Sequence, residues 1–120
     1  MDADEVAQLA NQLDTLGLEL REITADGNCM FRAVSDQMVG TDDNYRKLRQ
    51  NTCLYIMKNK AHFLPFIGES DDEFKRFIKY LNTDGVFGGH EALVAMSREN
   101  NVMIGIHQVG EPVWYSEWFP

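Results

Sequence analysis

The chain has little cysteine, a deficit of basic residues and no long apolar run. Its two cysteines, Cys29 and Cys53, do not form the disulfide framework of a small secreted domain, and no Cys-x-x-Cys spacing indicates a metal site. The chain has eleven scattered Lys and Arg residues and nineteen Asp and Glu residues, so its formal net charge is −8. This charge argues against nucleic-acid or anionic-membrane binding. No signal peptide or membrane span is visible. We expect reduced thiols, no metal or cofactor, and an intracellular location in the cytoplasm or nucleus.

The length and the apolar content of the chain are sufficient for one hydrophobic core. At 120 residues, 44% apolar and 25% charged, the chain predicts a single domain spanning residues 1–120. The apolar periodicity predicts helices at about 4–17, 29–39, 44–62, 71–81 and 90–99, then a strand at 102–107 that pairs with 113–115 as a hairpin. The predicted fold class is α+β, with helices packed around a small, mostly antiparallel sheet.

The ends of these elements also have sequence signals. Asp4 is the expected N-cap of the first helix, and Ser70 with Glu73 forms a capping box before the helix at 71–81. Pro65 is expected to end the helix at 44–62, because proline disfavours helical geometry in the residue before it. The apolar strand at 102–107 suits the middle of a covered sheet, and the aromatic ending at 114–120 predicts an interface or a strand cut short.

The most informative stretch surrounds Cys29. The turn-forming residues Asp26, Gly27 and Asn28 precede it, and apolar residues follow it at helical spacing, namely Met30, Phe31, Val34 and Met38. Cys29 is therefore expected in the first helical turn, where free N–H groups and the helix dipole favour a thiolate. Gly27 would let the backbone curl so that its N–H groups point at a developing oxyanion, and Asn28 could add an amide donor. The alternative is a buried, inert cysteine, which is also what we expect of Cys53 in mid-helix.

Residues 25–33, Ala-Asp-Gly-Asn-Cys-Met-Phe-Arg-Ala, resemble the active-site segment of the ovarian-tumour-domain (OTU) cysteine proteases, which remove ubiquitin. Segments at 63–66, 85–93 and 102–108 follow in the family's order, and the resemblance extends from about residue 13 to 115. It implies an OTU-like fold, with Cys29 as the nucleophile, Asp26 as the acid of the motif, and the backbone of Asp26, Gly27 and Asn28 as the oxyanion hole. At Phe87-Gly88-Gly89 the paired glycines suit a groove for an extended tail, such as the one that ends ubiquitin.

The family's general base is a histidine in a late segment, and this chain stops at Pro120, before that segment. Either the chain is a fragment or short product, incomplete at the C-terminus, or the base has been lost. Of its three histidines, His62 is explained by a position at a helix end and His90 by a helix start. His107 ends the strand, where the family carries a histidine that is not its base, and it remains as a possible substitute.

The resemblance implies a ubiquitin-specific cysteine isopeptidase, with ubiquitin or ubiquitin chains as the partner. The alternative is a ubiquitin-binding or regulatory module without turnover, for which the missing late histidine argues. A thiol redox protein is a third hypothesis, weakened because no second cysteine stands near Cys29. The basic residues of the helix at 44–62 are expected to form a solvated face or to contact an acidic partner, namely Arg46, Lys47, Arg49, Lys58 and Lys60.

Overall fold

The computed structural model describes residues 2–108, 110 and, for the backbone, 113–115. Its elements are the helices α1 (Ala3–Thr15), α2 (Cys29–Val39), η1 (Asp42–Asn44), α3 (Tyr45–Lys58), α4 (Lys60–Ile67), α5 (Asp71–Leu81) and α6 (His90–Asn100), and the strands β1 (Ile104–Ile106) and β2 (Val113–Tyr115). The predictions for the side chain of Trp114 and for residues 116–120 lie outside the described residues.

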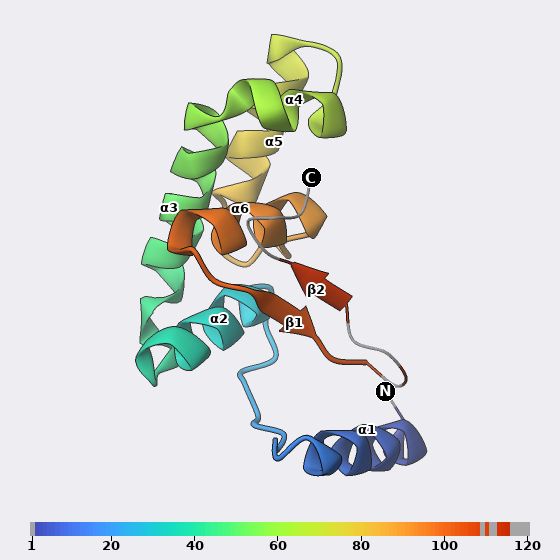
Figure 1. Ribbon diagram of the computed structural model, residues 1–120. Helices are drawn as coiled ribbons and strands as arrows, with labels where there is room; N and C mark the ends of the chain where they lie inside the picture. The colour runs from blue at the N-terminus through green and yellow to red at the C-terminus, as the bar shows by residue number, and fades with distance from the viewer. Residues whose placement is uncertain (1, 109, 111–112, 116–120) are drawn as a thin grey trace.

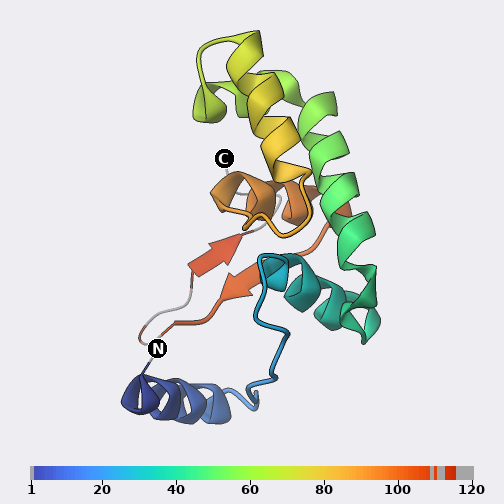
Figure 2. The same cartoon turned by 180° about the vertical axis from the view of Figure 1, so that it is seen from behind.

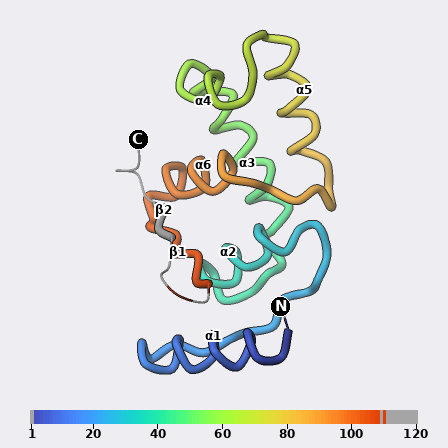
Figure 3. Tube along the Cα trace, turned by 90° about the vertical axis from the view of Figure 1, so that its right-hand side faces the viewer, coloured from blue at the N-terminus to red at the C-terminus, as the bar shows by residue number. Residues whose placement is uncertain are grey.

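The helices form one body from which α1 stands apart (Figure 1). Helices α3, α4 and α5 make an elongated stack, and α2 and α6 lie against the lower part of α3 (Figure 2). The hairpin β1–β2 lies between this body and α1 (Figure 3). An extended segment connects α1 to α2. The hydrophobic core is formed by α2, α3, α4, α5 and α6. Its fully buried side chains include Phe31, Ile56, Phe63, Leu81 and Met96.

Most helix ends follow the sequence signals. The Ser70 hydroxyl accepts from the Glu73 N–H at 3.2 Å, which confirms the capping box of α5. Helix α2 begins at Cys29 as expected and ends on Gly40 in a left-handed conformation. Helix α1 begins earlier than expected, because Asp2 rather than Asp4 is its N-cap and accepts from the Glu5 N–H at 2.8 Å.

The single helix expected at 44–62 is wrong. It is interrupted at Asn59, which ends α3 and precedes α4, and α4 continues through Pro65. Proline inside a helix removes one hydrogen bond, and the carbonyl left without that donor belongs to Ala61, an exposed residue whose oxygen can bond to water. The loss is therefore tolerated in this short helix.

The hairpin is confirmed, and its strands are shorter than expected. β1 pairs antiparallel with β2, with Ile104 opposite Tyr115 and Ile106 opposite Val113. The placement of β1 in the middle of a covered sheet is wrong for the described residues, whose sheet has two strands. Met103 and Ile106 are accordingly 62% and 37% exposed. Within the described part of the chain, no helix has both the length and the apolar character needed to cross a bilayer.

Candidate active site

Cys29 lies at the first position of α2, with its thiol half-buried. The first turn of a helix presents N–H groups without intrahelical acceptors, and the dipole there favours negative charge. Cys29 lines a groove of about 820 Å³ between α1, the 18–23 segment, α2 and β1. Other groove residues include Met30, Phe87, Ile104 and His107. The predicted position of Cys29 at the start of a helix is confirmed, and the residue borders this groove.

Asp26 braces the turn before Cys29. Its carboxylate accepts from the Asn28 backbone N–H at 2.9 Å, which closes an Asx turn, and it pairs with the Arg32 guanidinium at 3.0 Å. These bonds, the one from Arg32 foremost, hold the pKa of Asp26 below its ordinary value. The carboxylate is thus turned toward Arg32, one helical turn beyond the thiol, and stays ionised.

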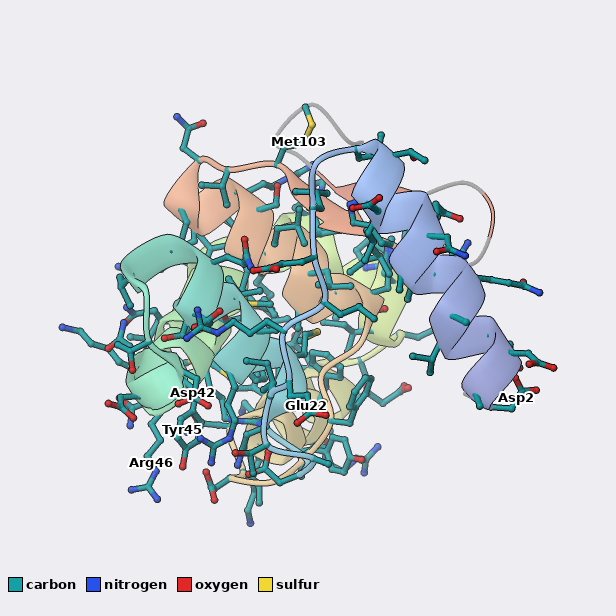
Figure 4. All side chains as sticks on the ribbon, turned by 90° about the horizontal axis from the view of Figure 1, so that it is seen from below. Asp2, Glu22, Asp42, Tyr45, Arg46 and Met103 are labelled. Carbon is teal, nitrogen blue, oxygen red and sulfur yellow. The ribbon has the colours of Figure 1, made fainter. Side chains whose placement is uncertain are left out.

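Arg32 in turn connects the loop to the next element of the chain. It lies 3.7 Å from Asp42 in η1, and its guanidinium stacks over the Tyr45 ring at 3.9 Å from the centroid. Figure 4 shows Asp42 and Tyr45 next to each other at one edge of the molecule. The turn before Cys29 is therefore fixed from outside by α2, η1 and the start of α3.

Asn28 is 3% exposed, and its side chain faces inward. Its Oδ1 accepts from the Gly85 N–H and from Arg49 Nη2, both at 2.8 Å, while its Nδ2 donates to Asp26 at 3.4 Å. One N–H of the amide that the sequence suggested as an oxyanion donor is therefore turned toward Asp26. Asn28 joins the turn before Cys29 to the loop after α5.

Gly27 is required by a close backbone approach rather than by curling of the chain. Its φ is not among the positive values, which the described glycines show at Gly17, Gly40, Gly85 and Gly110. A Cβ built on Gly27 would lie 1.4 Å from the carbonyl oxygen of Gly85. Any side chain at this position would displace the loop after α5.

The backbone donors of the expected oxyanion hole are partly engaged. The Asp26 N–H donates to Thr24 O at 3.0 Å, and the Asn28 N–H to the Asp26 carboxylate. Cys29 donates its own N–H to Asp26 O at 3.2 Å. Of the three residues named from the sequence, Gly27 has the one N–H with no acceptor among the described residues.

The three residues expected to form a tail groove have different surroundings. Phe87 is 64% exposed and lines the Cys29 groove. Gly88 is buried, and a Cβ there would lie 2.2 Å from Cε of Met30. Gly89 is exposed and is the N-cap residue of α6. Gly88 thus lets the loop before α6 lie closely against the Met30 side chain of α2, next to Phe87.

Arg49 is the site residue that the sequence analysis misread. Its expected place on a solvated face is wrong, because the residue is 2% exposed and bonds to Asn28, the residue before the cysteine. Arg46, Lys47 and Lys58 are exposed, as expected. The helical spacing does indicate that Arg49 is buried. Arg49 lies four residues after Tyr45 and four before the buried Cys53, which places it on the inner face of α3.

The histidines separate into two places. The expected position of His62 at a helix C-terminus is wrong. The residue lies in the first turn of α4, where its Nε2 is 2.7 Å from Arg98 Nη1. His90 begins α6, as expected, and both histidines line a small pocket away from Cys29. His107 lies on the wall of the Cys29 groove. Among the described residues, no cluster of three or more His, Cys, Asp and Glu is placed to hold a metal.

Comparisons with known proteins give the same picture. Residues 24–118 match a family model described as OTU-like cysteine protease. The Mus musculus "OTU domain-containing protein 3" is 41% identical over 111 residues, which are 92% of this chain and 28% of that protein. The Arabidopsis thaliana "OVARIAN TUMOR DOMAIN-containing deubiquitinating enzyme 7" is 42% identical over 111 residues, with 92% and 29% covered. The chain thus spans less than a third of the length of these curated relatives.

The fold also matches a solved structure. The chain described as "Structure of OTUD1 OTU domain" superposes with a TM-score of 0.85 at 30% identity, covering 94% of this chain and 78% of that one. The α+β fold expected from the sequence is therefore confirmed.

Proposed function

Because the chain belongs to the OTU-like cysteine protease family, we propose that it carries the nucleophile of a deubiquitinase, with Cys29 attacking the carbonyl at the C-terminus of ubiquitin. The observation that carries the proposal is the position of Cys29, at the positive end of α2 and on the wall of a groove. A thiol so placed borders the groove and is accessible to a substrate.

The groove supports an extended peptide as the substrate. Phe87 contributes an exposed aromatic ring beside Cys29, and apolar residues of β1 line the other side. Gly88 lets the loop before α6 lie close to Met30, which also lines the groove. A glycine-ended tail such as that of ubiquitin can lie along this wall and bring its last carbonyl to the thiol. We propose Phe87, Gly88 and Gly89 as the groove for that tail.

The reaction proceeds through an acyl-enzyme. The Cys29 thiol gives its proton to a base and its sulfur forms a bond to the carbonyl carbon, the isopeptide C–N bond breaks, and the departing lysine amine takes up that proton. Water then hydrolyses the thioester and returns the thiol. His107 is the histidine that the described groove wall contains, and we keep it as a candidate proton acceptor.

Stabilisation of the oxyanion requires a change in the loop. Asp26 and Asn28 already donate their N–H groups to neighbours within the loop, and Gly27 alone has its N–H available. We infer that Gly27 supplies the first oxyanion donor, and that a second becomes available when bound substrate displaces a local acceptor. Asp26 then acts by holding the turn through Arg32.

The engaged donors favour a second candidate function. A chain that captures ubiquitin in the groove, with its oxyanion hole unformed, would be a ubiquitin-binding module without turnover.

For both candidate functions α1 helps to enclose the groove, and Gln12 bonds to Gln108 O and to the Gly110 N–H, both at 2.9 Å. This link supports the proposal that residues 1–120 act as one domain.

Ubiquitin with a thiol-reactive group at its C-terminus tests the assignment. We expect one adduct, located at Cys29 by mass analysis, and no adduct in Cys29→Ala. Cys53→Ala is the matched control, because Cys53 is buried in α3, and it should label at the wild-type rate. No adduct in a folded wild-type chain, or an adduct that persists in Cys29→Ala, would contradict the proposal.

Turnover separates the two candidate functions. A ubiquitin C-terminal amide that fluoresces on hydrolysis should be cleaved by the wild-type chain and not by Cys29→Ala. Adduct formation with no hydrolysis would favour the binding module. Loss of hydrolysis in a folded His107→Ala variant that still forms the adduct would identify the proton acceptor.

A further inference from the structure

The guanidinium of Arg49 is buried and bonds to four acceptors. Nη1 donates to Leu81 O at 2.7 Å, and Nη2 lies at bonding distance from Val86 O (2.6 Å), Asn28 Oδ1 (2.8 Å) and Gly27 O (3.3 Å). These acceptors belong to three separate parts of the chain, namely the turn before Cys29, the end of α5 and the loop before α6. One side chain from α3 therefore ties these three segments together.

The charge of Arg49 has no close carboxylate partner. Among the described residues, each ion pair within 4.0 Å involves a basic residue other than Arg49. The guanidinium stacks over the Phe31 ring, 4.3 Å from its centroid, and its Nε is buried without an acceptor. Burial lowers the pKa of Arg49 from its ordinary value. A buried cation that relies on neutral acceptors is costly for stability, so packing alone does not explain it.

The acceptors are adjacent to the groups that react and bind. Asn28 precedes Cys29, and Val86 precedes Phe87 on the groove wall. The same Asn28 Oδ1 also accepts from the Gly85 N–H, so the two loops share one acceptor. A displacement of Arg49 would therefore change the position of the thiol relative to the groove.

We propose that Arg49 is a positioning residue that holds the turn before Cys29 in register with the loop bearing Phe87. This inference rests on the proposed role of Cys29 as the nucleophile. Arg49 does not touch the reacting atoms in this account; it acts through Asn28 and Val86. Its planar fork is what the role requires, because two nitrogens must reach acceptors on opposite sides. A lysine keeps the charge and loses this geometry.

Arg49→Lys is the first test, with Arg76→Lys as its matched control. Arg76 lies on α5, is exposed and makes none of these contacts. We measure the rate of Cys29 labelling by the ubiquitin probe over a range of probe concentrations. We expect the maximal rate to fall roughly tenfold to a hundredfold in Arg49→Lys, with the half-saturating concentration changed far less. Arg76→Lys should match the wild type.

The buried thiol of Cys53 reports on folding in the same samples. If Arg49 only stabilises the fold, Arg49→Lys will expose Cys53 to alkylation and reduce the amount of labelled protein, while the intact fraction reacts at the normal rate. That result would overturn the proposal, as would a wild-type maximal rate in folded Arg49→Lys. We expect Cys53 to stay protected.

Chemical rescue gives an independent measurement. Arg49→Ala leaves a cavity of guanidinium shape, and methylguanidinium at low millimolar concentration should restore part of the labelling rate, whereas methylammonium should not. Equal effects of the two ions, or no rescue in an Arg49→Ala chain that folds, would contradict the positioning role. If Arg49→Ala does not fold, Arg49→Lys decides alone.

A separate reagent distinguishes failure of this inference from failure of the proposed function. If the wild-type chain does not react with the ubiquitin probe, the proposed function is wrong. The role of Arg49 is then tested by measuring the rate at which iodoacetamide alkylates Cys29. Its rate at Cys29 should then fall several-fold in Arg49→Lys and remain normal in Arg76→Lys. An unchanged rate at Cys29 would overturn the Arg49 proposal on its own.

Discussion

Replacing Gly27 with alanine places a methyl group inside the backbone of the neighbouring loop. The new Cβ would lie 1.4 Å from the carbonyl oxygen of Gly85 and 2.3 Å from its carbon. Ordinary contact at a Cβ begins near 3.4 Å, so one of the two loops must retreat by about 2 Å. Backbone atoms cannot swing aside as the end of a long side chain can, and the whole loop has to move.

The energetic consequence follows from the bonds that span this contact. A retreat of that size breaks the bond from the Gly85 N–H to Asn28 and the bond from Arg49 to Val86 O. A neutral hydrogen bond contributes about 0.5–1.5 kcal/mol and one to a charged group about 1.5–3 kcal/mol. We therefore expect Gly27→Ala to lower the free energy of unfolding by about 2–4 kcal/mol.

Urea denaturation measures this loss, and Gly89→Ala is the control. A Cβ at Gly89 has no neighbour closer than 3.9 Å, and its φ of −116° suits any residue, so its effect should stay within about 1 kcal/mol, the cost of a poorer N-cap for α6. Labelling of Cys29 by the ubiquitin probe should also slow in Gly27→Ala and not in Arg76→Lys, whose exposed site lies outside the groove. Equal stability of Gly27→Ala and Gly89→Ala would refute the steric argument.

Three further predictions concern the core, the turn and the second thiol. Phe31→Ala empties a fully buried site and should cost about 3–5 kcal/mol in urea unfolding; a loss below about 1 kcal/mol would disprove its place in the core. Arg32 holds the pKa of Asp26 in the folded chain below its ordinary value of 3.8. The Asp26–Arg32 pair therefore contributes fully to stability above that pH, and its contribution disappears as the pH falls through the pKa of Asp26 in the folded chain. Asp26→Asn should therefore flatten the acid side of a plot of the urea midpoint against pH, and parallel curves would count against the ion pair. Burial raises the pKa of the Cys53 thiol to about 11, so iodoacetamide at about pH 8 should modify it in urea only, and modification of the native chain would contradict its burial.

Local signals in the sequence sufficed where neighbours in the chain make the contact. The capping box of α5 and the start of α2 at Cys29 rest on residues three or four apart, and both are confirmed. The hairpin likewise pairs two apolar stretches that are close together in the sequence. The break at Asn59 and the passage of α4 through Pro65 were missed, because packing of α4 against α5 outweighs local helix preference.

The sequence by itself determined that Cys29 stands at a helix start after a tight turn, and the resemblance of that segment indicated the family. Tertiary structure alone decided what surrounds it. Gly27 faces Gly85, 58 positions later, and Arg49 reaches Leu81 and Val86 from another helix. Helical spacing places Arg49 on the inner face of α3, but it does not identify partners so distant along the chain, since each contact depends on how the helices pack. The burial of Arg49 and the crowding of Gly27 against Gly85 therefore became visible only in the folded molecule.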